Sequence, residues 1–212
     1  MLTGIHAIIF DLDGTLYFSD GLAQEVNLAV CRLIARRGGI DPDAAAELVR
    51  DTRSRLSLAS GVETSLTSVC SELGVSPRQF HEALTPEVNP ESYLAPDERV
   101  AALLSSLKKH YELYVYTNNN RNLSSRIISA LGLSGLFSGV VTIEDSWRPK
   151  PDRSALRALL SSIGRLPEEC LFVGDRFDID LRLPAEMGSA VMLISSVEDL
   201  LRLEIPARGK PT

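Results

Sequence analysis

The sequence has 212 residues, of which 44% are hydrophobic and 24% charged, so it has enough apolar side chains to fold around a core and is unlike a disordered chain. The formal net charge of −6 argues against binding to a nucleic acid polymer or an anionic membrane. No apolar run is longer than five residues, which excludes a membrane-spanning helix, and we expect no signal peptide because no basic leader precedes an apolar stretch.

The chain opens with a buried strand at 6–11 and then shows helical patterns without a strand from about 20 to 84. Residues 22–34 keep a helical apolar period that ends at two glycines, and a capping box at 76–79 opens the last helix of this stretch. Four helices are predicted here, at about 22–38, from 42, at 62–73 and from 77.

We interpret these helices as a cap of residues 17–92, inserted into a core of residues 1–16 and 93–212. Direct packing of the same helices on the sheet is the alternative. Residues 18–21 and 85–96 would be linkers that let the cap move as a lid and select a ligand.

Two parts of the cap are expected to contact that ligand. One is Phe18, in the first linker, and the other is the arginine pair Arg36 and Arg37, in the loop at 36–41 between the first two cap helices. The alternative for both arginines is an interaction with the C-terminal end of the preceding helix.

The rest of the chain alternates strands with helices. Buried strands are predicted at 112–117, 139–143, 170–174 and 190–194, and helices at 97–109, 122–131, 152–163 and 196–203. This order predicts an α/β fold with a three-layer, Rossmann-like parallel sheet core and an inserted all-helical cap.

Acidic residues follow two of the strands, with Asp11 and Asp13 after the first and Asp175 and Asp180 after the fourth. Ligands of an open parallel sheet bind beyond the carboxyl ends of its strands, so we expect the two groups to meet there. Carboxylates at this density favour a hard cation such as Mg²⁺. A turn cap at Asp13-Gly14 is the alternative for the first pair.

Two other strand ends supply neutral and positive groups. Thr117 and Asn118 offer a hydroxyl, an amide and backbone N–H groups that suit an anionic oxygen, or else they only cap a helix. Lys150, between two prolines, presents a fixed cation or is an ordinary surface lysine.

These motifs, in this order, resemble those of the haloacid dehalogenase superfamily. The matching residues are Asp11-Leu-Asp13-Gly-Thr, Thr117, Lys150-Pro151, and Gly174-Asp175 with Asp180. The resemblance covers nearly the whole chain, and the helical insert resembles the cap of the subgroup with all-helical caps. The first and fourth motifs are specific, whereas the second and third count mainly by position.

The resemblance implies a phosphatase that works through an aspartyl-phosphate. Asp11 would be the nucleophile, and Asp13 would protonate the leaving oxygen and later take a proton from water. Thr117 with Asn118 would hold the phosphoryl group, and Lys150 would contact both the phosphate and Asp11.

The same resemblance implies a Mg²⁺ site. Its ligands would be Asp11, the backbone carbonyl of Asp13, and Asp175. Asp180 would orient the water shell of the metal or the side chain of Lys150.

A phosphoric monoester hydrolase acting on a small phosphorylated metabolite is the function implied, with a nucleoside 5′-monophosphate or a sugar phosphate as substrate. The presence of Asp13 argues against the dehalogenases, which lack this second aspartate. Residues 12–17 and 116–119 resemble the pyrimidine 5′-nucleotidase-like branch more than the phosphoglycolate phosphatases, although Phe18 stands where that branch often has proline. A phosphomutase of the β-phosphoglucomutase type and a non-catalytic interaction protein on the same scaffold are the alternatives.

Three cysteines, Cys31, Cys70 and Cys170, stand far apart among apolar neighbours. We interpret them as buried thiols in a reducing compartment and therefore expect a cytoplasmic protein without a disulfide or a zinc site.

Overall fold

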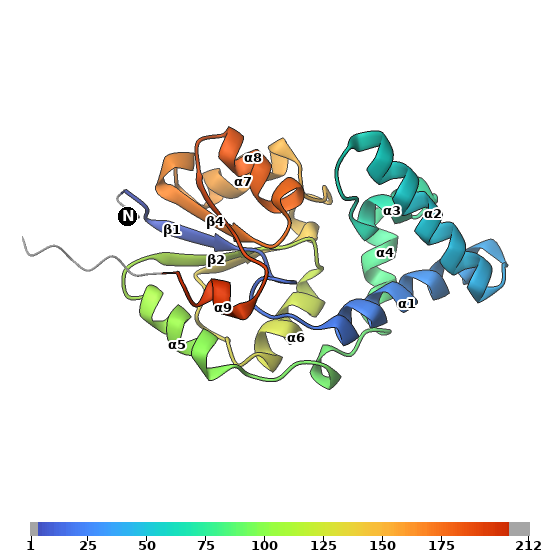
Figure 1. The fold of residues 1–212 in the computed structure, drawn as a ribbon, viewed down its shortest axis with the longest axis horizontal. Coiled ribbons are helices and arrows are strands. Elements are labelled where there is room, and N and C mark those ends of the chain that lie inside the picture. Colours follow the sequence, from blue (N-terminus) through green and yellow to red (C-terminus); the bar gives the residue numbers. More distant parts are fainter. Residues whose placement is uncertain (1–3, 204–212) are drawn as a thin grey trace, which may run out of the picture.

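The structure, a computed structural model, describes residues 4–203 of the chain. Its centre is a five-stranded parallel sheet in the order β3-β2-β1-β4-β5 (Figure 1). The strands are β1 (Ala7–Phe10), β2 (Glu112–Tyr116), β3 (Gly139–Val141), β4 (Cys170–Gly174) and β5 (Ala190–Leu193). All the predicted strands are present, but the two edge strands β3 and β5 are partly exposed and not buried as predicted. Strand β3 also ends earlier than expected, because Asp145 accepts a hydrogen bond from the backbone N–H of Thr142 and begins a short helical turn.

Helices cover both faces of this sheet. They are α5 (Glu98–Leu107), α6 (Arg121–Ala130), α7 (Arg153–Ile163), α8 (Arg182–Glu186) and α9 (Val197–Leu200). The helices α5, α6 and α9 lie on one side of the sheet and α7 lies on the other (Figure 1). Alternate residues of β1 point to opposite faces, so Ile8 and Phe10 pack with α5, α6 and α9, whereas Ala7 and Ile9 pack with α7. The prediction of a three-layer, Rossmann-like α/β core is confirmed. The sequence patterns missed α8 and the helical turn of residues 177–181 before it.

Four helices lie between β1 and α5 in the sequence and form a separate group at one side of the molecule (Figure 1). They are α1 (Asp20–Gly38), α2 (Pro42–Ser60), α3 (Leu66–Glu72) and α4 (Pro77–Leu84). They pack mainly on one another rather than on the strands, as an inserted helical cap does. The boundaries of the cap at residues 17 and 92 stay a proposal.

Both expected linkers are more ordered than the sequence indicated. The side chain of Ser19 accepts a hydrogen bond from Leu22 N (3.2 Å) and starts α1 at Asp20, so the end of the first linker belongs to a helix. In the second linker, Arg126 of α6 donates to the carbonyl oxygen of Val88 (3.0 Å) and pairs with Glu91 (2.6 Å). The return segment is therefore fastened to the core.

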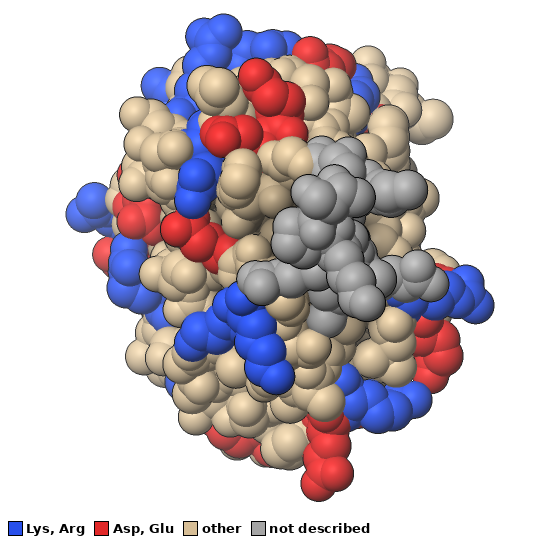
Figure 2. All heavy atoms as spheres, turned by 90° about the vertical axis from the view of Figure 1, so that its left-hand side faces the viewer, with Lys and Arg blue, Asp and Glu red and all other residues tan. Residues whose placement is uncertain are grey.

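Among residues 4–203, no helix combines the length and the apolar character that a membrane span requires. On the face drawn in Figure 2, basic and acidic side chains are interspersed. All three cysteines are free; Cys70 and Cys170 are buried as predicted, whereas Cys31 is only half-buried.

Candidate active site

A buried lysine joins two carboxylates at the carboxyl end of the sheet. Lys150 Nζ lies 2.6 Å from Asp11 Oδ1, 2.6 Å from Asp180 Oδ1 and 2.9 Å from the carbonyl oxygen of Tyr116. Asp11 follows β1, Lys150 lies in the loop after β3, and Asp180 lies in the helical turn after β4. The parallel sheet thus brings together three residues that are far apart in the sequence.

The charges in this group are incompletely balanced. Burial by itself would lower the pKa of Lys150, but Asp11 and Asp180 together raise it above its ordinary value, so the lysine is protonated. Burial raises the pKa of Asp11 to about 7, although the positive charge of Lys150 acts in the opposite direction. Lys150 is shared between Asp11 and Asp180, and both carboxylates have lost their hydration. A further positive charge would stabilise ionised Asp11.

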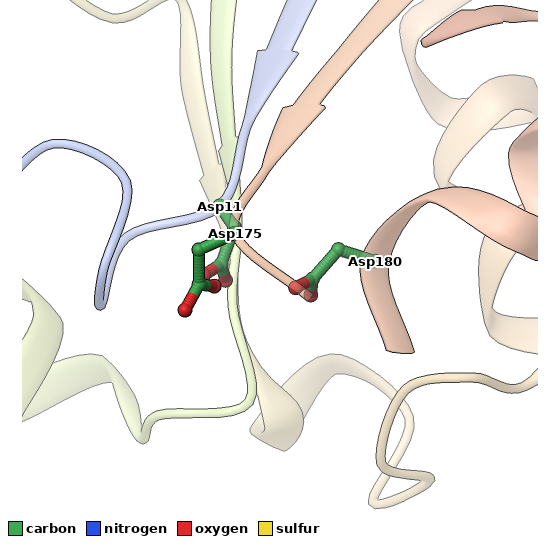
Figure 3. A group of neighbouring side chains, drawn as sticks. All are labelled: Asp11, Asp175 and Asp180. Atoms are coloured by element: carbon green, nitrogen blue, oxygen red, sulfur yellow. The ribbon is translucent and has the colours of Figure 1, made fainter. Parts of the chain in front are cut away.

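The free carboxylate oxygens indicate where such a charge would bind. Asp11, Asp175 and Asp180 each offer an oxygen, and these oxygens lie within 4.8 Å of one another (Figure 3). Asp11 Oδ2 and Asp175 Oδ1 are buried and have no hydrogen-bond partner in the described part of the chain. Both oxygens of Asp180 are already used, by Lys150 Nζ and by the backbone N–H of Arg176 (3.2 Å). The donor set therefore fits a hard cation held by Asp11 and Asp175, with Asp180 positioning Lys150.

Asp13, two residues after Asp11, faces two donors. Asn119 Nδ2 donates to its Oδ2 at 2.7 Å, and the hydroxyl of Tyr17 donates to its Oδ1. Burial, together with the nearby carboxylates, raises the pKa of Tyr17 well above its ordinary value, so the phenol keeps its proton and remains a donor. These contacts fix the direction of the Asp13 carboxyl group and leave a lone pair on each oxygen for a further partner.

The loop after β2 connects the site to the loop after β3. Thr117 is buried, and its Oγ1 accepts the backbone N–H of Asn119 (3.1 Å). Asn118 Oδ1 accepts a hydrogen bond from the backbone N–H of Lys150 (2.7 Å), so this asparagine holds the loop that carries Lys150. Asn118 also lines the cleft that is described below. The structure thus brings together all seven predicted site residues.

Three further side chains in the site were missed by sequence reasoning: Tyr17, Asn119 and Arg176. The guanidinium of Arg176 lies 3.6 Å from Asp175 and 3.8 Å from Asp180. Four carboxylates (Asp11, Asp13, Asp175 and Asp180) then face two cations (Lys150 and Arg176), which leaves a formal charge of −2. Arg176 directly follows Asp175 within the fourth motif, and this position is the sequence signal from which its place in the site could have been predicted.

A cleft of about 390 Å³ lies between these site residues of the core and the helical cap. Its core side carries Asp13, Asn118, Asn119, Asp175 and Arg176, and its polar cap side carries Asn27, Arg53, Ser65, Thr67 and His81. Phe18 lines the cleft as predicted, but no residue of 36–41 does. Arg36 instead pairs with Glu87, so the expectation that this loop meets the ligand is not supported. The cap supplies a different arginine, Arg53, from the middle of α2.

Comparison with known proteins agrees with this architecture. The model of the haloacid dehalogenase-like hydrolase family matches residues 5–188. A phosphoglycolate phosphatase of Aquifex aeolicus is 29% identical over 197 residues, which cover 89% of this chain and 84% of that protein. Pyrophosphatase PpaX of Bacillus velezensis is 29% identical over 178 residues, which cover 82% of this chain and 76% of that protein.

A solved structure shares the fold. The crystal structure of a HAD phosphatase from Thermococcus onnurineus matches with a TM-score of 0.58 at 22% identity, covering 90% of this chain and 86% of that chain. The family match extends over most of the sequence and includes all four motifs. The chain therefore belongs to the haloacid dehalogenase-like hydrolase family, and the prediction of a hydrolase of this family is confirmed.

Proposed function

We propose that this protein is a Mg²⁺-dependent phosphatase that hydrolyses a small phosphate monoester through an aspartyl-phosphate on Asp11. The observation that carries the proposal is the geometry around Asp11. One oxygen of this carboxylate is held by Lys150 at 2.6 Å, and the other is buried without a partner among residues 4–203. The names of the two relatives, a phosphoglycolate phosphatase and a pyrophosphatase, support the same chemistry.

The chain's own residues can supply both chemical steps. Asp11 attacks phosphorus, the ester P–O bond breaks, and Asp13 gives its proton to the leaving oxygen. Asp13 then takes a proton from water, which attacks phosphorus and releases phosphate and the free Asp11 carboxylate. Thr117, Asn118 and Lys150 hold the phosphoryl group, and Asp180 keeps Lys150 in place.

Asp11, Asp175 and the backbone carbonyl of Asp13 would hold the Mg²⁺. Bound there, the ion would offset negative charge on the carboxylates and on the phosphoryl group. Asp11 and Asp175 each have a buried oxygen that accepts no hydrogen bond within residues 4–203, which supports this assignment, and so does the formal charge of −2.

Removal of the metal is expected to abolish activity. Treatment with EDTA should stop the hydrolysis of p-nitrophenyl phosphate, and added Mg²⁺ should restore it. Excess Ca²⁺ should inhibit, because this larger ion takes six to eight ligands and would draw Asp11 into extra coordination, away from its line of attack on phosphorus. An Asp175→Asn variant should need at least about tenfold more Mg²⁺ for half-maximal rate.

Asp178→Asn is the matched control for Asp175→Asn. Asp178 lies in the same segment, is partly exposed and pairs with Arg182 at 3.5 Å, outside the proposed site. It should leave the Mg²⁺ dependence unchanged. Full activity after exhaustive chelation would refute the metal assignment.

A Gly14→Ala variant tests how tightly the first and fourth motifs must approach each other. Gly14 has a φ of +74°, and an added Cβ would lie 2.7 Å from Asp175 Cγ. We expect kcat/KM to fall at least about tenfold because Asp175 must move. Gly135→Ala is the control, since Gly135 has a similar φ of +77° but open space around it. Equal kinetics in the two variants would mean that the contact with Asp175 does not affect catalysis.

The substrate is to be sought among small phosphorylated compounds. Phosphoglycolate and pyrophosphate follow from the names of the relatives, and nucleoside 5′-monophosphates and sugar phosphates follow from the motifs. The filled and assembled catalytic positions argue against a non-catalytic interaction protein. Release of inorganic phosphate across a panel of these compounds, with Mg²⁺ present, tests the proposal.

A further inference from the structure

The cap side of the cleft contains a histidine that the proposed chemistry does not use. His81 of α4 lines the cleft, yet only 2% of its surface is exposed. Its Nε2 lies 3.3 Å from Thr67 Oγ1, and its buried Nδ1 has no hydrogen-bond partner in the described chain. A buried polar atom without a partner is costly, so Nδ1 is a candidate for a hydrogen bond with a bound ligand.

The imidazole is neutral at physiological pH, because burial lowers the pKa of His81 to about 4. A neutral imidazole donates from one nitrogen and accepts at the other. The hydroxyl of Thr67 can take either role toward Nε2, so Nδ1 can present either a proton or a lone pair. A hydroxyl group of a ligand can donate to the lone pair of Nδ1 or accept its proton, so it pairs with either state of the ring. A carboxylate can only accept a proton, and the neutral ring offers it no positive charge.

The position of His81 relative to the catalytic loops is fixed by the core. Asn120, which follows the Thr117 loop, is buried and donates from Nδ2 to the carbonyl oxygen of His81 (2.9 Å) and to Thr85 Oγ1 (3.2 Å). At the start of α4, the guanidinium of Arg78 lies 5.0 Å from the ring centre of Trp147 in the core. Both ends of α4 are therefore attached to the core, so the histidine stays at a set distance from the phosphate loop.

We propose that His81 is a specificity-determining residue, and that its neutral imidazole binds a hydroxyl group on the organic part of the substrate. The enzyme would then prefer phosphate esters of polyhydroxy alcohols to esters of the corresponding plain alcohols. This inference rests on the proposed phosphatase function and names the substrate class for it.

The test compares glycerol 1-phosphate with propyl phosphate, which differ only in hydroxyl groups on the same carbon chain. Wild type should prefer glycerol 1-phosphate about tenfold or more in kcat/KM, with the difference mainly in KM. In His81→Phe, which keeps a flat ring but no nitrogen, the preference should fall to within about twofold. His81→Asn places an amide near the position of Nδ1 and should retain part of the preference.

His110→Phe is the matched control, because His110 is exposed on the core and outside the cleft. It should keep the wild-type preference. If His81→Phe also keeps that preference, the proposal is refuted. It is also refuted if His81→Phe abolishes a preference for phosphoglycolate over ethyl phosphate while the hydroxyl preference persists, since the residue would then recognise a carboxylate.

Two measurements separate this inference from the proposed function. Thermal unfolding shows whether His81→Phe is folded at the assay temperature; if it is not, the preference of wild type and of His81→Asn decides the question. A wild type that hydrolyses p-nitrophenyl phosphate without any preference between the two alkyl esters refutes the role of His81 alone. A wild type that hydrolyses none of these esters refutes the proposed function, and the inference with it.

Discussion

An Asp11→Asn variant is expected to lose about 10⁴-fold or more in kcat for every phosphate ester, because the amide cannot replace the carboxylate that attacks phosphorus. The fold should survive the change. Asparagine has nearly the same shape as aspartate, and Lys150 keeps Asp180 as a partner at 2.6 Å. Steady-state rates at saturating Mg²⁺ measure the loss, and thermal unfolding confirms that the variant is folded.

Acid-quenched wild-type enzyme should carry phosphate on the peptide that contains Asp11, as mass spectrometry can detect, and the variant should carry none. Asp178→Asn makes the same chemical change in a partly exposed residue outside the proposed site and should keep the wild-type rate. A variant that retains a tenth of the wild-type kcat, or phosphate trapped on a different residue, would show that Asp11 is not the nucleophile.

Sequence reasoning worked best for the core because its signals are local. The apolar segment before Asp11 predicts a strand, and parallel strands place their carboxyl ends at one edge, so Asp11, Lys150 and Asp175 could be brought together without coordinates. The hydrogen bonds that fix Asp13 could not be predicted in this way. They depend on Asn119, which is 106 residues away in the sequence, and on the bend that lets Tyr17 turn back toward the strand end.

In the cap, even less of the site could be predicted from the sequence. Helical periodicity indicates which residues are buried, but it does not indicate which buried polar residue faces a cleft. Arg36 and Arg37 stood out because they flank a glycine-rich loop, yet the structure pairs Arg36 with Glu87 and places Arg53 on the cleft. His81, near the end of a short amphipathic helix, has no local signal; its role depends on Asn120, which belongs to the core.

Replacement of Asp13 by Asn is expected to slow the enzyme by about 10²–10⁴-fold on an alkyl phosphate, since an alkoxide needs a proton from Asp13 to leave. The first step should be much less affected with p-nitrophenyl phosphate, because p-nitrophenolate leaves without a proton. The variant is expected to fold. The Asn119 amide can turn its oxygen toward the new amide, and the hydroxyl of Tyr17 can accept as well as donate.

Steady-state rates alone would not isolate this role, because Asp13 is also proposed to activate water for the second step. Rapid mixing separates the two steps. With Asp13→Asn and p-nitrophenyl phosphate, we expect a burst of p-nitrophenolate close to the enzyme concentration, followed by slow turnover as the aspartyl-phosphate accumulates. With an alkyl phosphate the same variant should show no burst of alcohol, since the first step itself has become slow. Equal single-turnover losses on the two substrates would mean that Asp13 does not protonate the leaving group, and its carboxyl group would then serve the water step alone.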